Sequence, residues 1–199
     1  MAITRYFVMR HATSEANLKG TVQGLLDVPL ALQGKEEAAE VGKALRTLGI
    51  TRVYTSPLQR ALETALIVAE QLSVEVSFVN GFRARNLGEW EGMSRDEINE
   101  IWADPNHPFG NNPDFAPPKG ESLRNMDARI LGAVEHILEG DTKEVPLFVM
   151  HIVGAGTVIH HATKKRSGLK NAEVWELNSE EKTARLIIAP NSQNLPAHE

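Results

Sequence analysis

The feature that most restricts the fold of this chain is a regular alternation of short apolar runs with longer segments of helical period. Residues 6–9 and 147–150 are apolar runs too short for helices, and they match buried strands. Residues 32–48, 58–72 and 122–138 carry apolar side chains three and four positions apart, as amphipathic helices do. This alternation predicts an α/β fold in three layers, with a mostly parallel central sheet and helices on both faces.

Weaker signals complete the predicted order of elements. Ser94 and Glu97 have the spacing of a capping box, which predicts a helix through about Trp102. A further helical stretch follows residue 150 and ends near Thr163. Additional strands are expected at 52–55 and 74–79, with a closing hairpin of 173–177 and 184–188 around Asn178–Ser179.

Two segments are expected to lack regular structure. Residues 104–119 are rich in proline and asparagine and predict a long loop, of the kind that often forms a lid or binds a ligand. The tail after Pro190 is expected to fray. Since the sequence shows neither an internal repeat nor a linker, residues 1–199 are expected to form a single domain.

Composition and charge exclude several classes of protein. The formal net charge is -5, whereas nucleic-acid-binding domains usually carry a basic surplus. The chain has no cysteine, which excludes disulfides, thiolate nucleophiles and cysteine-bound zinc. The most apolar stretch, 145–159, contains His151 and falls short of the ~18 apolar residues of a membrane span. A cytoplasmic protein is therefore expected, without nucleic-acid or membrane partners.

Basic side chains follow three of the predicted elements. Arg10 and His11 come directly after the first strand, and His151 comes after the strand at 147–150. Arg60 lies in the first turn of a predicted helix, where the helix dipole disfavours a cation by roughly 0.3–1 kcal/mol. Taken singly, each has an ordinary explanation, such as a strand leaving the core or a histidine satisfied within it.

Taken together, these four side chains predict an anion site. Ligands of open α/β sheets bind outside the carboxyl ends of the strands, where distant segments meet. Arginine binds phosphate oxygens through a bidentate fork, and a neutral histidine is able to attack phosphorus. The amides of a helix following His11 would add to anion binding. No metal or cofactor is required, and the adjacent His160 and His161 lack the spacing of a helical metal site.

The order of motifs along the chain resembles that of the histidine phosphatase superfamily, which includes cofactor-dependent phosphoglycerate mutases. Arg10-His11-Ala12-Thr13, with Asn17, is similar to the first motif of that family. Further similar segments are Gln23-Gly24 with Asp27, Pro29-Leu30 and Gly34; 55–65; 87–92; 118–122; and His151. The resemblance covers nearly the whole chain and implies a phosphoglycerate mutase-like fold.

The resemblance also implies roles for the matched residues. His11 would be the phosphorylated nucleophile, while Arg10, Arg60 and His151 would bind the phosphoryl group and stabilise its charge in the transition state. Asn17 and the amide near Gln23 would shape the phosphate pocket. Thr13 and Ile152, which stand close to the two histidines in sequence, join them as candidate substrate-binding residues.

Three positions depart from the family pattern. Ala12 and Ile152 replace glycines that usually follow the two histidines. Ala84 stands where members commonly place the glutamate that serves as general acid. Either Glu89 or Glu91 replaces that acid, or, as their place in the 87–92 segment favours, both are ordinary members of that motif.

Two arginines flank the vacant acid position. Arg83 and Arg85 would either bind a second acidic group of a substrate or belong to a solvated charged loop. The sequence leaves both alternatives open.

Three hypotheses for function follow. The first is a metal-independent phosphomonoesterase that works through a phosphohistidine on His11 and is slowed by Ala84. The second is a phosphoglycerate mutase. The third is a catalytically impaired pseudo-phosphatase that binds a phosphorylated ligand or protein. The expected partner is a small phosphorylated substrate or phosphate, and the sequence carries no signal for the natural substrate or the oligomeric state.

Overall fold

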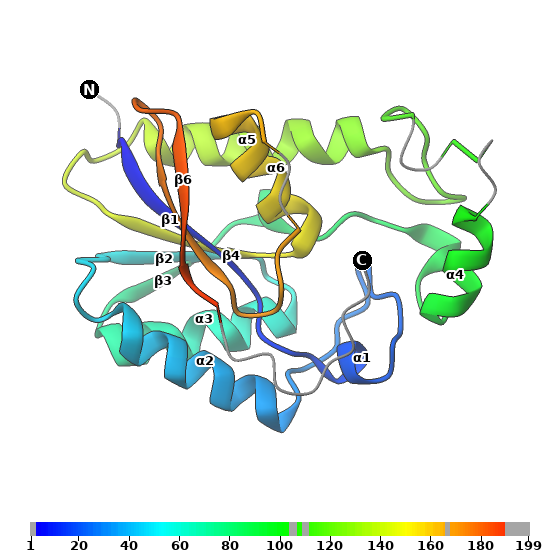
Figure 1. Ribbon diagram of the computed structural model, residues 1–199, viewed down its shortest axis with the longest axis horizontal. Helices are drawn as coiled ribbons and strands as arrows, with labels where there is room; N and C mark the ends of the chain where they lie inside the picture. The colour runs from blue at the N-terminus through cyan, green and yellow to red at the C-terminus, as the bar shows by residue number, and fades with distance from the viewer. Residues whose placement is uncertain (1–2, 104–106, 109–111, 166–167, 190–199) are drawn as a thin grey trace.

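The computed structural model describes residues 3–103, 107–108, 112–165 and 168–189 (Figure 1). Two single-turn 3-10 helices, Asn80–Phe82 and Gly88–Trp90, lie between β3 and α4. The other elements are, in chain order, β1 (Arg5–Arg10), α1 (Glu15–Leu18), α2 (Leu32–Leu45), β2 (Arg52–Thr55), α3 (Gln59–Leu72), β3 (Glu75–Phe78), α4 (Arg95–Trp102), α5 (Leu123–Leu138), β4 (Pro146–Met150), α6 (Ile152–Thr163), β5 (Val174–Asn178) and β6 (Thr183–Ile188).

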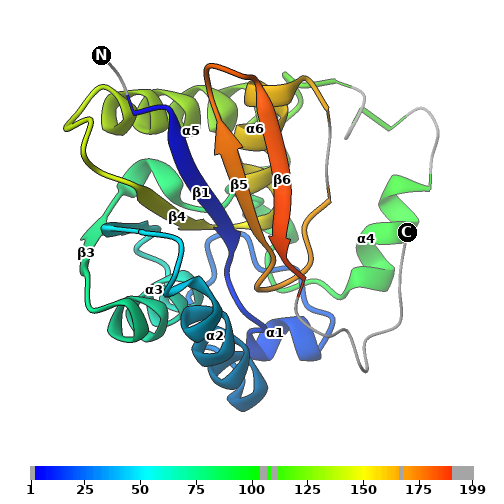
Figure 2. The same cartoon turned by 60° about the vertical axis from the view of Figure 1, so that its left-hand side comes forward.

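The strands form one six-stranded sheet in the order β3-β2-β4-β1-β5-β6. The neighbours β3, β2, β4 and β1 are parallel, whereas β5 and β6 pair antiparallel at one side. Figures 1 and 2 show α2 and α3 over one face of the sheet and α5 and α6 over the other. The predicted α/β fold with a mostly parallel central sheet and helices on both faces is confirmed.

The central strands are apolar throughout because both of their faces are covered. In β1, Phe7 and Met9 pack into the core beneath α2 and α3. Tyr6 and Val8 point the other way, into the core beneath α5 and α6. Successive side chains of a strand face opposite sides of the sheet, so a short apolar run contributes to two cores at once.

Several boundaries differ from those expected from the sequence. Helix α2 ends at Leu45, earlier than residue 48, because residues 46–48 turn toward Gly49, which has a positive φ of 72°. Helix α1 is added by a capping box between Ser14 and Asn17. The capping box of Ser94 and Glu97 begins α4, as predicted.

The predicted closing hairpin is confirmed as β5 and β6, and Asn178 Oδ1 accepts the amides of Glu180 and Glu181 in its turn. The predicted loop 104–119 lies partly outside the described residues, and its described part, 107–108 and 112–119, contains no helix or strand. The predicted fraying tail after Pro190 lies wholly outside them. Within the described ranges, no helix has both the length and the apolar character needed to cross a membrane.

Candidate active site

The carboxyl ends of three neighbouring parallel strands bring His11, Ser56 and His151 together. The amide of His11 donates to Met150 O at 2.9 Å, and the amide of Ser56 donates to Val149 O at 3.2 Å. The ring centroids of His11 and His151 are 5.3 Å apart, and both side chains are buried. The predicted convergence of these two distant histidines is therefore present in the structure.

The hydrogen bond of His11 assigns its neutral tautomer. Its Nδ1 lies 2.8 Å from Ala12 O, and a carbonyl oxygen only accepts, so Nδ1 carries the proton. Nε2 is left with a lone pair. Burial, together with the charges of Arg10 and Arg60, lowers the pKa of His11 well below its ordinary value. At neutral pH, His11 is thus an uncharged imidazole with a basic nitrogen.

Two guanidinium groups accompany the histidines, that of the buried Arg60 and that of the half-buried Arg10. Arg60, 1% exposed, donates to Gly24 O and Leu26 O at 2.8 Å each, which holds the segment beside it. Arg10 donates to Leu169 O at 2.6 Å. Burial lowers the pKa of each guanidinium to about 10, so both stay protonated at neutral pH.

One buried nitrogen on each of three of these side chains has no hydrogen-bond partner among the described residues: Nε of Arg10, Nε of Arg60 and Nδ1 of His151. Buried polar groups normally have a partner in protein, water or ligand, so these three nitrogens are candidate contacts for a ligand. Two cations with these donors suit a phosphoryl group.

The pKa of His151 is also well below its ordinary value, chiefly because of burial and then because of the charge of Arg60. The unfolded chain therefore binds more protons than the folded protein below pH 6.5, the ordinary histidine pKa. By linkage, stability falls as the pH decreases through this range, because protons bind preferentially to the unfolded chain.

This pH dependence is a testable prediction. Urea unfolding measured between pH 7.5 and 5.5 is expected to show a shallower loss of stability in His151→Gln than in the parent. His160→Gln serves as control, because His160 is exposed on α6. Equal slopes in the two variants would contradict the depressed pKa of His151.

The other phosphate-pocket candidates are tied into a network beside His11. Asn17 Oδ1 accepts from the amide and hydroxyl of Ser14 and from Asn171 Nδ2, at 2.9 to 3.1 Å. Gln23 Oε1 lies 3.0 Å from the same Ser14 Oγ, so the single hydroxyl hydrogen is shared between the two acceptors. Asn171 Nδ2 also donates to His11 O at 3.0 Å, which connects the network to the histidine backbone.

Thr13 and Ile152 lie in different environments. The amide and hydroxyl of Thr13 donate to the two oxygens of Glu37, at 2.9 Å each, so its hydroxyl has a structural partner. Ile152 is the first residue of α6 and is 43% exposed. The structure thus places an apolar side chain directly after His151 at the surface.

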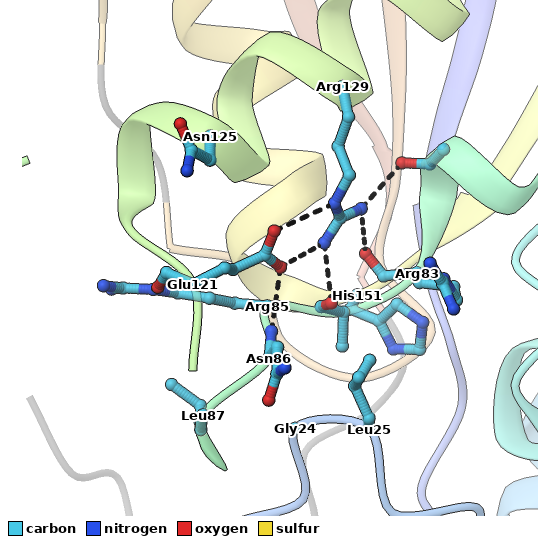
Figure 3. A network of polar contacts seen from close by, with 12 residues as sticks. Gly24, Leu25, Arg83, Arg85, Asn86, Leu87, Glu121, Asn125, Arg129 and His151 are labelled. Atoms are coloured by element: carbon cyan, nitrogen blue, oxygen red, sulfur yellow. Dashed lines mark hydrogen bonds and ion pairs between the residues drawn. The ribbon is translucent and has the colours of Figure 1, made fainter. Parts of the chain in front are cut away.

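The segment around Ala84, where the family resemblance led us to expect an acid, is held in place by Arg129. Its five N–H groups donate to the carbonyls of Gly81, Arg83 and Ala84 and to both carboxylate oxygens of Glu121 (Figure 3). Arg129 therefore has no N–H left for a substrate. The segment that carries Ala84, 8% exposed, is fixed through its backbone rather than through the side chain at 84.

The two glutamates considered as replacement acids have other partners. Glu91 Oε1 accepts the amides of Leu25 and Leu87, at 2.8 and 3.0 Å, and its side chain fills the space that a Cβ on Gly24 would need. Glu89 is exposed and lies 2.9 Å from Lys119 Nζ. These contacts match a structural role for Glu91 and a surface role for Glu89.

The two arginines that flank Ala84 differ in exposure. Arg83 is exposed. Arg85 is buried and donates to Phe115 O at 2.8 Å and to Glu121 O at 3.0 Å, and burial lowers its pKa. Arg85 therefore connects its own segment to the backbone at Phe115 and at Glu121.

Sequence reasoning missed the parts of the site that act on other side chains. Ser56 contacts His151, Asn171 contacts His11, and Arg129 contacts the segment around Ala84. Of these three residues, only Ser56 had a signal in the sequence, because it directly follows the strand β2. Within the described ranges, no three histidine, aspartate or glutamate side chains gather as a metal site requires.

Comparisons with known proteins match this geometry. A model of the histidine phosphatase superfamily (branch 1) matches residues 6–195. A "Probable phosphoglycerate mutase GpmB" of Citrobacter koseri is 28% identical over 191 residues, which cover 92% of this chain and 87% of that protein.

Solved structures are similar in fold. Bacillus stearothermophilus YhfR is 27% identical, with a TM-score of 0.81 over 96% of this chain and 98% of its own. A mycobacterial glucosyl-3-phosphoglycerate phosphatase, solved with vanadate, has the same TM-score at 22% identity, over 95% of this chain and 100% of its own. At that identity, the likeness is one of fold.

Proposed function

This chain belongs to the histidine phosphatase superfamily (branch 1), and from that premise we propose that it hydrolyses phosphate monoesters through a phosphohistidine on His11. One observation carries the proposal. A neutral His11 with its proton fixed on Nδ1 leaves a basic Nε2 near the guanidinium groups of Arg10 and Arg60. A nucleophile next to fixed cations is the arrangement that phosphoryl transfer requires.

The reaction takes place in two steps. In the first, the Nε2 lone pair of His11 forms a bond to phosphorus, the ester P–O bond breaks, and the leaving oxygen takes its electron pair and then a proton from water. In the second, water attacks phosphorus and gives up a proton, and the P–N bond breaks to return the lone pair to Nε2. The products are an alcohol and inorganic phosphate.

The cationic side chains of the site stabilise the charge that develops during these steps. The unpaired Nε groups of Arg10 and Arg60 donate to the phosphoryl oxygens. The guanidinium groups are held by Leu169, Gly24 and Leu26, so little reorganisation is needed when charge builds up. A small phosphorylated molecule is the partner that this site accepts.

Trapping of the phosphoenzyme tests the mechanism. A radiolabelled phosphoryl donor is expected to leave an acid-labile, base-stable label on the parent and on His160→Ala, but not on His11→Ala. Labelling of His11→Ala at the level of the parent would overturn the proposal.

A phosphoglycerate mutase is the second candidate, since the curated relative from Citrobacter koseri carries that name. A mutase must return the phosphoryl group to an alcohol, and Ala84 provides no group that exchanges the alcohol proton. A coupled assay with 3-phosphoglycerate distinguishes the two functions. Robust interconversion without net release of phosphate would favour the mutase.

A pseudo-phosphatase is the third candidate, suggested by Ala84 and Ile152. Comparison of an aryl with an alkyl phosphate separates it from a slowed enzyme. Turnover of the aryl ester with poor turnover of the alkyl ester supports an enzyme without its acid, because an aryl oxide leaves without protonation. Tight binding of phosphate esters with no turnover of either supports the binding protein.

A further inference from the structure

The buried hydroxyl of Ser56 has no part in the steps above, yet it touches the site. Ser56 follows β2 directly and is 0% exposed. Its Oγ lies 2.9 Å from His151 Nε2 and accepts the amide of Leu58 at 3.2 Å. One oxygen thus joins the second histidine to the residue that precedes α3, the helix that carries Arg60.

The direction of the Ser56–His151 hydrogen bond follows from the count of donors and acceptors. A serine hydroxyl has one hydrogen to donate. Ser56 Oγ accepts from Leu58, and an amide N–H cannot accept in return. Among the contacts of the described residues, His151 Nε2 is the acceptor within reach of the hydroxyl hydrogen.

The opposite direction would leave unsatisfied groups on both sides. If His151 Nε2 carried the proton, the Ser56 hydroxyl hydrogen would be buried without an acceptor, which is unfavourable. Nδ1 would then present a lone pair to the site, where a phosphoryl oxygen would be repelled. With the proton on Nδ1, the buried nitrogen that lacks a protein partner is a donor.

We propose that Ser56 is a positioning residue: its hydroxyl donates to His151 Nε2 and thereby keeps the proton of His151 on Nδ1, where it donates to the phosphoryl group. This rests on the proposed function for the identity of the ligand. The two histidines then have complementary uses. His11 presents a lone pair through Nε2, and His151 presents a donor through Nδ1.

The amide of Leu58 helps to orient the Ser56 hydroxyl. By donating to Oγ, it fixes the side-chain rotamer of Ser56 and leaves the hydroxyl hydrogen to point at the imidazole. The same turn leads into α3, so the orientation of His151 and the placement of Arg60 depend on one short segment.

Nitrogen NMR on protein labelled in its histidines tests the proposal directly. In the parent, His151 is expected to show a protonated Nδ1 and an unprotonated Nε2. Ser56→Ala is expected to give a mixture of tautomers and to weaken binding of inorganic phosphate by about tenfold or more. Ser56→Thr, which keeps the hydroxyl, is expected to restore the single tautomer.

Thr55→Val is the matched control, because Thr55 is equally buried and its hydroxyl contacts backbone carbonyls of Ser56 and Val149 rather than a histidine. It is expected to lose stability without a change in the His151 tautomer. A protonated Nε2 of His151 in the parent would overturn the proposal. The nitrogen NMR spectrum of the parent therefore tests the proposal even if Ser56→Ala does not fold.

An unchanged tautomer and unchanged phosphate affinity in folded Ser56→Ala would overturn it as well. These measurements need no turnover, so they remain decisive if His11 proves not to be phosphorylated. If the parent takes up no phosphoenzyme label while its His151 still carries the proton on Nδ1, the proposed function is rejected. The role of Ser56 then still stands.

Discussion

Hydrolysis of an aryl phosphate is expected to fall by at least ~10³-fold when His11 is replaced by alanine, since the nucleophile is lost while the rest of the pocket remains. The ring of His11 is buried beside that of His151, whose Nε2 already contacts Ser56 Oγ at 2.9 Å. Initial rates at saturating substrate give the comparison.

Retention of ligand binding distinguishes a chemical defect from a collapsed site. His11→Ala keeps Arg10, Arg60 and His151, so inorganic phosphate is expected to bind within about tenfold of the parent affinity. His160→Ala, on the exposed side of α6, is the control for loss of a histidine elsewhere. Turnover of His11→Ala above a tenth of the parent rate would contradict the nucleophilic role.

The largest expected gain comes from Ala84→Glu. A general acid typically contributes ~10²–10⁴-fold, so alkyl phosphate hydrolysis is expected to rise by about 10²-fold. Aryl phosphate hydrolysis is expected to change little, since its leaving group departs as a stable anion. The measurement is the ratio of kcat/KM for the alkyl phosphate to kcat/KM for the aryl phosphate. Differences in the fraction of active protein cancel in this ratio.

The contacts that hold the segment around Ala84 do not depend on its side chain. Arg129 and Glu121 hold the segment through the carbonyls of Gly81, Arg83 and Ala84 and the amide of Asn86 (Figure 3). A new side chain at 84 removes none of these contacts.

Ala84→Gln is the matched control, because glutamine has the shape of glutamate without its acidic proton. A gain for Ala84→Glu alone identifies proton donation as the missing function. Equal rates in the two variants would show that the acid is not what limits the reaction.

Local sequence determined which residues would leave the strands toward the site. The apolar runs before His11 and His151 are short because each belongs to a buried strand, and the first polar residue after such a run marks its exit. Arg60 was detectable for a similar reason, as a cation in the first turn of a helix. Together with the rule for strand ends in α/β sheets, these patterns predicted the four central side chains.

The sequence also indicated the departure at Ala84, but not its consequences. That Glu91 holds Leu25 and Leu87, and that Arg129 uses all its donors on the neighbouring backbone, depends on segments far apart in the chain. Neither residue carries a local pattern that separates it from an ordinary surface charge.

Periodicity, caps and strand exits are properties of neighbours in sequence, because backbone geometry repeats over two to four residues, and they predicted most of the elements and the four central candidate residues. Only the tertiary structure decided the strand order β3-β2-β4-β1-β5-β6 and the contact of Ser56 with His151, which are 95 residues apart. Strand order follows from how the two cores on either face of the sheet pack together. The proton on His151 follows in turn from that order, because β2 and β4 must be neighbours for a hydroxyl after one to reach an imidazole after the other.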